Sequence, residues 1–211
     1  MMANYVLEGV METVLSNTDV GTWLSRNMEM LVVPFVDKDG VEQGDQGKNR
    51  QPHDHNRDYA NESRFTTVRA IRQKVPSCGR ERLRMVLDLH CPCLRNRGSG
   101  FAENESIFFV GARDKRIWDH TEHFSRILAE SATGPLPHHP ADNVPFGQKW
   151  NVDQTYAKGR SCKEWGATLP AVQIAATLEI AYANARGAEV NADSTRAFGH
   201  DLARTIANWL Q

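Results

Sequence analysis

Short apolar segments with strand character alternate with amphipathic segments of helical period along most of the chain. Residues 30–36 form a continuous apolar run with β-branched members, which is typical of a strand buried on both faces. Because strands that alternate with helices pack as layers, the pattern predicts an α/β domain. The expected strands are 30–36, 84–90, 106–110 and 175–182, and the expected helices are 6–15, one ending near 27, 62–75, 116–132 and 192–210.

Composition narrows the class of protein. A length of 211 residues predicts a single domain, 1–211. The 25 Lys and Arg residues are balanced by 26 Asp and Glu residues, with a pI near 6.7, which argues against nucleic acid as a partner. No apolar run approaches the ~20 residues that span a bilayer, and no secretory signal opens the chain, so we expect no membrane association and a cytoplasmic location. Four cysteines are too few to indicate a disulfide framework.

The densest group of polar and charged residues is 48–58, Lys-Asn-Arg-Gln-Pro-His-Asp-His-Asn-Arg-Asp. It follows an expected strand and a glycine-rich turn, which places it at the carboxyl end of that strand, where α/β proteins bind ligands. An Asn next to an Arg, as at Asn56 and Arg57, can bind a carboxylate through the amide and the guanidinium. A solvated polar loop with local ion pairs accounts for the same residues equally well, so both interpretations stay open.

His90 ends an apolar expected strand. An imidazole at a strand end is well placed to ligate a metal. Asp88 lies two residues earlier, on the same face of the strand, and can orient the imidazole. A hydrogen-bonded structural role is the alternative for an isolated histidine of this kind. A structural zinc site at Cys91 and Cys93 is not predicted, because no second Cys pair with finger spacing occurs.

Glu179 lies inside an otherwise apolar expected strand, in the sequence Thr-Leu-Glu-Ile. Burying a carboxylate without a partner is costly, so this one is expected to be paired, close to a metal or catalytic. Burial would raise its pKa and suit it to act as a general base on a metal-bound water. Exposure at a strand end, or pairing with an arginine, is the alternative.

Four short segments resemble the sequence landmarks of one enzyme family and occur in the same order along the chain. They are 33–41 (Val-Pro-Phe-Val-Asp-Lys-Asp-Gly-Val), 54–58 (Asp-His-Asn-Arg-Asp), 88–90 (Asp-Leu-His) and 177–179 (Thr-Leu-Glu). Together they resemble landmarks of the zinc metallocarboxypeptidases of the carboxypeptidase A superfamily, in its cytosolic carboxypeptidase-like branch. The resemblance implies a mixed, mostly parallel sheet covered by helices on both faces. It also implies a hydrolase that uses one zinc ion to remove C-terminal residues from peptides or proteins.

The resemblance assigns roles to four residues at the centre of the reaction. Asn56 and Arg57 would hold the C-terminal carboxylate of the substrate. His90 would be the third protein ligand of the zinc. Glu179 would be the general base that takes a proton from zinc-bound water and delivers it to the leaving amine.

Three further residues have implied contacts with the substrate. The family uses an additional Arg near the first cluster to polarise the scissile carbonyl and stabilise the oxyanion. Lys48 or Arg50 is expected to take this role. A family tyrosine upstream of the glutamate closes over the substrate, and Tyr156 is the candidate.

The sequence departs from the family pattern at the residues that would ligate the zinc. The first two zinc ligands of the family come from a His-x-x-Glu motif, and none of the eight histidines here has Glu three residues later. The first amphipathic helix begins at once, without a capping residue, and resembles the stretch that follows that motif. We therefore expect a domain that lacks its N-terminal strands and two zinc ligands, an incomplete ligand set, and weak or absent activity of this chain alone.

Two other interpretations remain open. In one, the chain is a non-catalytic binder of peptide C-terminal carboxylates that uses Asn56 and Arg57. In the other, it is an unrelated α/β domain in which His90 and Glu179 are structural. Missing N-terminal strands would expose a sheet edge, so self-association through that edge is also expected.

Overall fold

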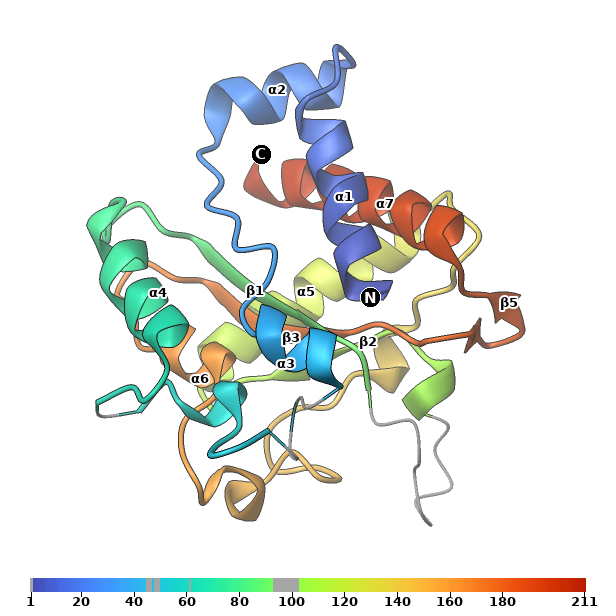
Figure 1. The fold of residues 1–211 in the computed structure, drawn as a ribbon. Coiled ribbons are helices and arrows are strands. Elements are labelled where there is room, and N and C mark those ends of the chain that lie inside the picture. The colour runs from blue at the N-terminus through green and yellow to red at the C-terminus, as the bar shows by residue number, and fades with distance from the viewer. Residues whose placement is uncertain (1, 45–46, 48–49, 61, 93–102) are drawn as a thin grey trace.

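A three-stranded sheet with the strand order β1–β3–β2 lies at the centre of the molecule (Figure 1). The computed structural model describes residues 2–44, 47, 50–60, 62–92 and 103–211. β1 (Met85–His90) runs parallel to β3 (Ile174–Glu179), and β2 (Phe108–Gly111) runs antiparallel to β3. The sheet is therefore mixed as expected, but a mostly parallel sheet is not confirmed, because one of the two described strand pairs is antiparallel.

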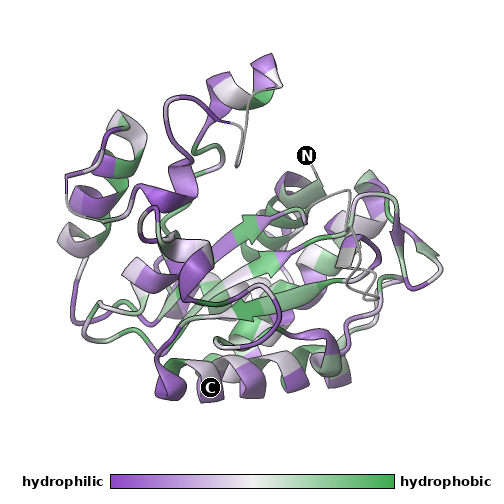
Figure 2. Ribbon diagram, turned by 90° about the horizontal axis from the view of Figure 1, so that it is seen from below, coloured by the Kyte–Doolittle hydropathy of each residue, from purple (hydrophilic) through white to green (hydrophobic). Residues whose placement is uncertain are grey.

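Helices pack against this sheet, whose strands are mostly hydrophobic (Figure 2). Most of the helices lie where the hydrophobic period predicts them. The last expected helix, 192–210, coincides with α7, and 116–132 matches α5 within one residue at each end. None of the helices in the described ranges combines the length and the hydropathy that a bilayer span requires. The helices are α1 (Met2–Val14), α2 (Asp19–Asn27), α3 (Lys38–Gln43), α4 (Thr66–Ser77), α5 (Lys115–Ser131), α6 (Cys162–Gly166) and α7 (Ala192–Leu210), with short 3-10 turns η2 (His55–Arg57), η3 (Glu103–Glu105), η4 (Pro140–Asp142) and η5 (Asp153–Tyr156) and a small hairpin of β4 (Asn184–Ala185) and β5 (Ala188–Glu189).

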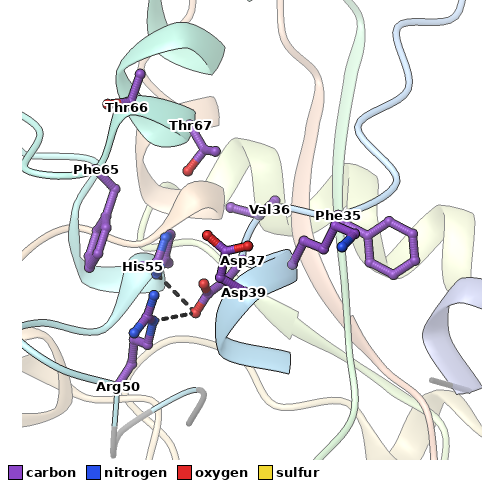
Figure 3. Close-up of a pocket in the computed structure, with 10 residues that line it drawn as sticks. Phe35, Val36, Asp37, Asp39, Arg50, His55, Phe65, Thr66 and Thr67 are labelled. Atoms are coloured by element: carbon purple, nitrogen blue, oxygen red, sulfur yellow. Dashed lines mark hydrogen bonds and ion pairs between the residues drawn. The ribbon is translucent and has the colours of Figure 1, made fainter. Parts of the chain in front are cut away.

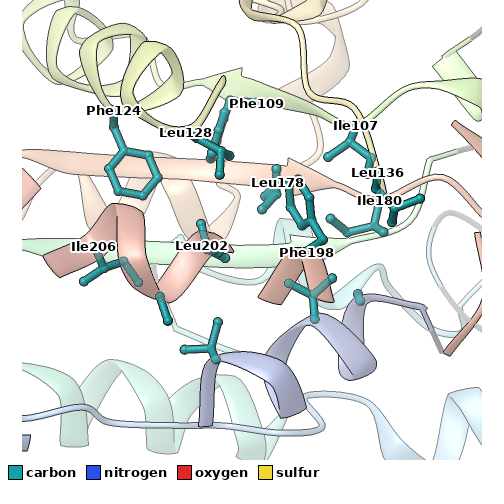
Figure 4. Packing of buried hydrophobic residues seen from close by; sticks show 14 of the residues in the cluster. Ile107, Phe109, Phe124, Leu128, Leu136, Leu178, Ile180, Phe198, Leu202 and Ile206 are labelled. Carbon is teal, nitrogen blue, oxygen red and sulfur yellow. The ribbon is translucent and has the colours of Figure 1, made fainter. Parts of the chain in front are cut away.

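The main hydrophobic core lies between one face of the sheet and the helices α1, α5 and α7 (Figure 4). Phe109 and Leu178 project from the strands, and Phe124 and Phe198 project from α5 and α7. Fully burying each such side chain contributes about 1.5–3 kcal/mol relative to exposure. α1 and α7 approach each other closely, because a Cβ at Gly9 would lie 2.1 Å from the carbonyl oxygen of Arg196.

The opposite face of the sheet divides into an apolar half and a polar half. Val86 and Ala175 pack with Trp165 and with hydrophobic residues of α4 in a second cluster. Closer to the carboxyl ends of β1 and β3 the same face carries polar side chains. The expected cover of both faces by helices is therefore not confirmed, and the polar half is where the candidate site lies.

The segment 30–36 is not a strand, so this prediction was wrong. It runs as irregular chain between α2 and α3. Leu31, Val33 and Phe35 are exposed, and Asn4 holds the segment by donating to the carbonyl of Pro34 at 2.8 Å. An apolar run with β-branched residues fits a buried strand only where a neighbouring strand offers hydrogen bonds, and the described part of the chain offers none here.

A buried polar network ties β2 to α5 and to the long segment that follows α5. His138 Nδ1 donates to the carbonyl of Ile107 at 3.0 Å, and the hydroxyl of Ser125 donates to His138 Nε2 at 2.7 Å. Asn143 donates to Ser125 at 2.7 Å and accepts from the backbone N–H of Phe109 at 2.9 Å. Every contact suits a neutral imidazole, and burial lowers the pKa of His138 to about 4.

We predict that this histidine makes the protein less stable in mild acid. The unfolded chain takes up a proton near pH 6.5 and the folded protein only near pH 4, so the unfolded state binds more protons between these values. The contribution of neutral His138 to the free energy of unfolding is fully present above pH 6.5, and it falls by about 3 kcal/mol as the pH drops toward 4. Urea unfolding across this range should show a shallower pH dependence in His138→Gln, whereas the exposed neighbour variant His139→Gln should match the wild type. Equal slopes in all three proteins would contradict the prediction.

Candidate active site

Four polar side chains share the polar half of the sheet face. In the parallel register His90 of β1 lies opposite Glu179 of β3, and Asp88 lies opposite Thr177. Side chains two residues apart on a strand point to the same face, so all four project together. Glu179 is buried, with 7% of its surface exposed. The strands thus bring the two distant candidates, His90 and Glu179, side by side.

Asn56 of η2 connects this face to two other parts of the chain. Its side-chain Nδ2 donates to Asp88 Oδ2 at 3.1 Å and lies 3.1 Å from His90 Nε2. Its Oδ1 accepts from the backbone N–H of Cys162, the first residue of α6, at 2.8 Å. The turn itself is capped by Asp54, whose carboxylate accepts from the Asn56 N–H at 2.8 Å. Asn56 is therefore used as a link within the protein.

Asp88 and His90 form an ion pair, with 3.0 Å between Asp88 Oδ1 and His90 Nε2. Burial works against the charge on each, but mutual attraction and hydrogen bonding outweigh it. The pKa of Asp88 is held below its usual value, with further help from Asn56 and Thr177. The pKa of His90 is raised to about 9, because Asp88 and Glu179 both favour the imidazolium.

Arg57 follows Asn56 in the chain but faces a different set of partners. Its Nη1 donates to the carbonyl of Asn56 at 2.7 Å, and its Nε donates to the carbonyl of Thr155 at 3.1 Å. The guanidinium carbon lies 4.8 Å from the centre of the Tyr156 ring, and Asp54 lies 3.9 Å from Nη1. Nη2 makes no hydrogen bond to any residue in the described ranges.

Lys163, a buried lysine that the sequence analysis did not single out, contacts the same tyrosine ring. Lys163 of α6 has 2% of its side chain exposed, and its Nζ lies 4.6 Å from the centre of the Tyr156 ring. Nζ donates to the carbonyl of Gly111 at 2.9 Å and contacts Glu164 at 3.2 Å. Burial lowers the pKa of Lys163, and the contact with Glu164 opposes this shift.

Arg50 lies in a neighbouring cavity of about 310 Å³ (Figure 3). Its Nε donates to Asp37 Oδ2 at 2.8 Å, and the same oxygen lies 3.2 Å from His55 Nδ1. The His55 ring stacks on Phe65 with 3.6 Å between centroids. Arg50 is therefore paired with Asp37, not directed at the His90 and Glu179 pair. Lys48, the other candidate for the carbonyl-polarising role, lies outside the described residues.

Within the described residues the donor set does not form a zinc site. His90 supplies one imidazole, whose Nε2 contacts Asp88 and Asn56, so a metal would have to bind at Nδ1. His55 is engaged by Asp37 in the adjacent cavity. Across the residues that the structure describes, no group of three or more His, Cys, Asp or Glu side chains is arranged to hold a metal ion. A catalytic zinc normally has three protein ligands, so His90 alone does not fit it.

Solved structures of the same fold were found for nearly the whole chain. A metallo-carboxypeptidase from Burkholderia cenocepacia superposes with a TM-score of 0.69 at 18% identity. One from Pseudomonas aeruginosa, in complex with (2-guanidinoethylmercapto)succinic acid, superposes with a TM-score of 0.66 at 19% identity. Each match covers 99% of this chain and 53% of the other, so the chain spans about half the length of these structures. No family model and no curated protein matches the sequence.

The chain has a metallocarboxypeptidase fold. Within this fold, η2 and the carboxyl ends of β1 and β3 bring Asn56, His90 and Glu179 into one group, with Arg57 at its border. Tyr156 joins Arg57, whereas Arg50 belongs to the adjacent cavity.

Sequence reasoning missed two residues that contact Tyr156, namely Lys163 and Asn151, whose Oδ1 accepts from the tyrosine hydroxyl at 2.7 Å. Both occur in the proline-rich stretch 133–166, which shows no period from which burial can be inferred. The only local signal is Ser161, which caps α6 and so fixes where Lys163 begins its helix. Asp88 was correctly placed beside His90, because alternation along a strand is enough to predict it.

Proposed function

We propose that this chain is a carboxypeptidase-type hydrolase module that binds the C-terminal carboxylate of a peptide through Arg57, with Glu179 as the general base. The single observation that carries the proposal is that Arg57, His90 and Glu179 gather at one end of a sheet with the metallocarboxypeptidase fold. Ligands of α/β proteins bind at the carboxyl ends of the strands, and this group lies there.

The chemistry of Arg57 supports carboxylate binding. Two of its nitrogens are held by backbone carbonyls, which fix the plane of the guanidinium. Nη2 is left to donate to a ligand, and a charge-assisted bond to a carboxylate contributes about 1.5–3 kcal/mol. Asn56 uses its amide to donate to Asp88 and to accept from the backbone N–H of Cys162, so we assign it to positioning Arg57 through its carbonyl.

Glu179 and His90 form the part of the proposed site where hydrolysis would occur. Glu179 is buried and adjacent to His90, which suits a group that receives a proton. His90 would serve as one zinc ligand in the proposed hydrolase. Since no group of three or more His, Cys, Asp or Glu side chains in the described residues is arranged to hold a metal ion, the proposed hydrolase needs zinc ligands in addition to His90.

Arg57→Ala is predicted to abolish the preference for free peptide C termini. The wild-type chain should bind a peptide with a free carboxylate about tenfold or more tightly than the same peptide as its C-terminal amide, since the carboxylate makes the charge-assisted bond. Isothermal titration of both peptides against both proteins measures this. Arg82→Ala is the matched control, because Arg82 is an exposed arginine paired with Glu29 on the surface. Equal affinity of the wild type for acid and amide would refute the proposed carboxylate site.

A second prediction concerns zinc. This chain, purified with added zinc and then desalted, should retain well below one equivalent and release little or no C-terminal residue from peptides, because His90 is the one imidazole of the described site. Mass spectrometry of the metal and chromatography of peptide digests provide the measurements. Near-stoichiometric zinc together with release of C-terminal residues would show that the ligand set is complete.

The second candidate function is a non-catalytic binder of peptide C-terminal carboxylates. The observation that favours it is that no group of three or more His, Cys, Asp or Glu side chains in the described residues is arranged to hold a metal ion, whereas Arg57 is already held in place by two backbone carbonyls. Binding lost in Arg57→Ala without any turnover supports this candidate over the hydrolase.

We also propose that the chain self-associates through the free edge of β1. Within the described ranges β1 pairs with β3 alone, and its residues are half-buried while those of β2 and β3 are buried. Exposed Val33 and its neighbours add apolar surface. Light scattering should show a mass that rises with concentration, and Val33→Lys should lower it more than the control Val41→Lys, which changes an exposed valine of α3. A monodisperse monomer at all concentrations would count against this.

A further inference from the structure

The ring of Tyr156 lies between a proposed ligand-binding group and a buried framework. Two cations lie within 5 Å of its centre, Arg57 at 4.8 Å and Lys163 at 4.6 Å. Its hydroxyl donates to Asn151 Oδ1 at 2.7 Å. The ring is therefore fixed both at its hydroxyl and by the charges near its face.

Asn151 and Lys163 tie this ring to the end of β2. Asn151 is fully buried, and its Nδ2 donates to the carbonyls of Gly111 at 2.9 Å and Val144 at 3.1 Å. Lys163 donates to the same Gly111 carbonyl at 2.9 Å and to Asn151 Oδ1 at 3.3 Å. Gly111 is the last residue of β2, so the tyrosine is anchored to the central sheet.

Movement of Tyr156 away from this position would be costly. Asn151 Oδ1 would lose its hydroxyl donor inside the protein, and Lys163 would lose the ring beside its buried charge. Arg57 is bound to the same segment a second time, because its Nε donates to the carbonyl of Thr155. The backbone before the tyrosine and the ring of the tyrosine thus both set the position of the guanidinium.

We propose that Tyr156 is a fixed platform that aims Arg57 at its ligand, and that Asn151 and Lys163 are positioning residues that hold this platform. This inference rests on the proposed carboxylate-binding role of Arg57. It differs from the lid expected for Tyr156, because a lid acts on the ligand through its hydroxyl, whereas a platform acts on Arg57 through its ring.

Two substitutions of the tyrosine separate these roles. Tyr156→Phe keeps the ring and removes the hydroxyl, and Tyr156→Leu removes the ring. The dissociation constant of a peptide with a free C terminus should rise about threefold in the first and about tenfold or more in the second, in line with a lost cation–π contact. Equal losses in the two variants would overturn the platform, since they would assign the effect to the hydroxyl.

Lys163→Met tests the framework behind the ring. We expect a several-fold loss of affinity in the wild-type background and no further loss in Tyr156→Leu, because Lys163 acts through the tyrosine. Additive losses would overturn this role, because they would show that Lys163 acts independently of Tyr156. Thermal unfolding reports whether Lys163→Met folds. If it does not fold, the comparison of Tyr156→Phe with Tyr156→Leu still tests the role of Tyr156 as a platform.

A measurement without peptide separates failure of this inference from failure of the proposed function. The Nε–H signal of Arg57 in nitrogen-15 spectra can be assigned by its loss in Arg57→Lys, and the Tyr156 ring current should displace it. Tyr156→Phe should retain the displacement, and Tyr156→Leu and Lys163→Met should reduce it. A displacement that stays the same in both Tyr156→Leu and Lys163→Met would overturn the role of Tyr156 as a platform. A signal that responds as expected, in a protein that does not discriminate acid from amide, would overturn the carboxylate site and leave the platform standing.

Discussion

The candidate site is built around the Asp88 carboxylate, which is largely shielded from water and therefore needs polar partners. Asp88 projects from β1 with 13% of its side chain exposed, and a charge in that position requires partners. His90 and Thr177 supply two from the sheet, and Asn56 supplies one from η2. Because Asn56 also accepts from the first N–H of α6, one buried charge holds two strands, a turn and a helix in register. Arg57 takes its place as the next residue of that turn.

Asn56 and Arg57 are adjacent in the sequence, and the resemblance gives them one shared role, yet the fold separates them. Asn56 faces Asp88 and His90, and binding a ligand with its amide would cost those contacts. Arg57 faces Tyr156 and keeps one nitrogen without a hydrogen bond in the described part of the chain. The carboxylate that we propose as the ligand of Arg57 would therefore leave the contacts of Asn56 with Asp88 and Cys162 in place.

The sequence pattern predicted the helices and strands that depend on local hydrophobic periodicity. It did not predict features that depend on contacts between distant parts of the chain. The apolar runs at 84–90 and 175–182 located β1 and β3, and segments of helical period located α5 and α7. The run 30–36 has the same apolar, β-branched character as these strands, but no strand of the described residues pairs with it, and its composition carries no information about that partner. Lys163 was missed for a related reason. Its helix start looks ordinary, and only the packing of Gly111, Asn151 and Tyr156 around it makes it a buried cation.

The proposed recognition and the proposed hydrolysis have different structural requirements. Arg57 is held by two backbone carbonyls and an aromatic ring, so it would lose little conformational entropy on binding the proposed carboxylate. The proposed hydrolysis also needs a metal centre, and no group of three or more donor side chains in the described residues is arranged to form one. The two proposed functions therefore share Arg57 and differ in what would surround His90. Because His90 Nε2 contacts Asp88 and Asn56, Nδ1 is the nitrogen that would ligate a metal, and Asp88 would then orient the imidazole through the same network that positions Arg57.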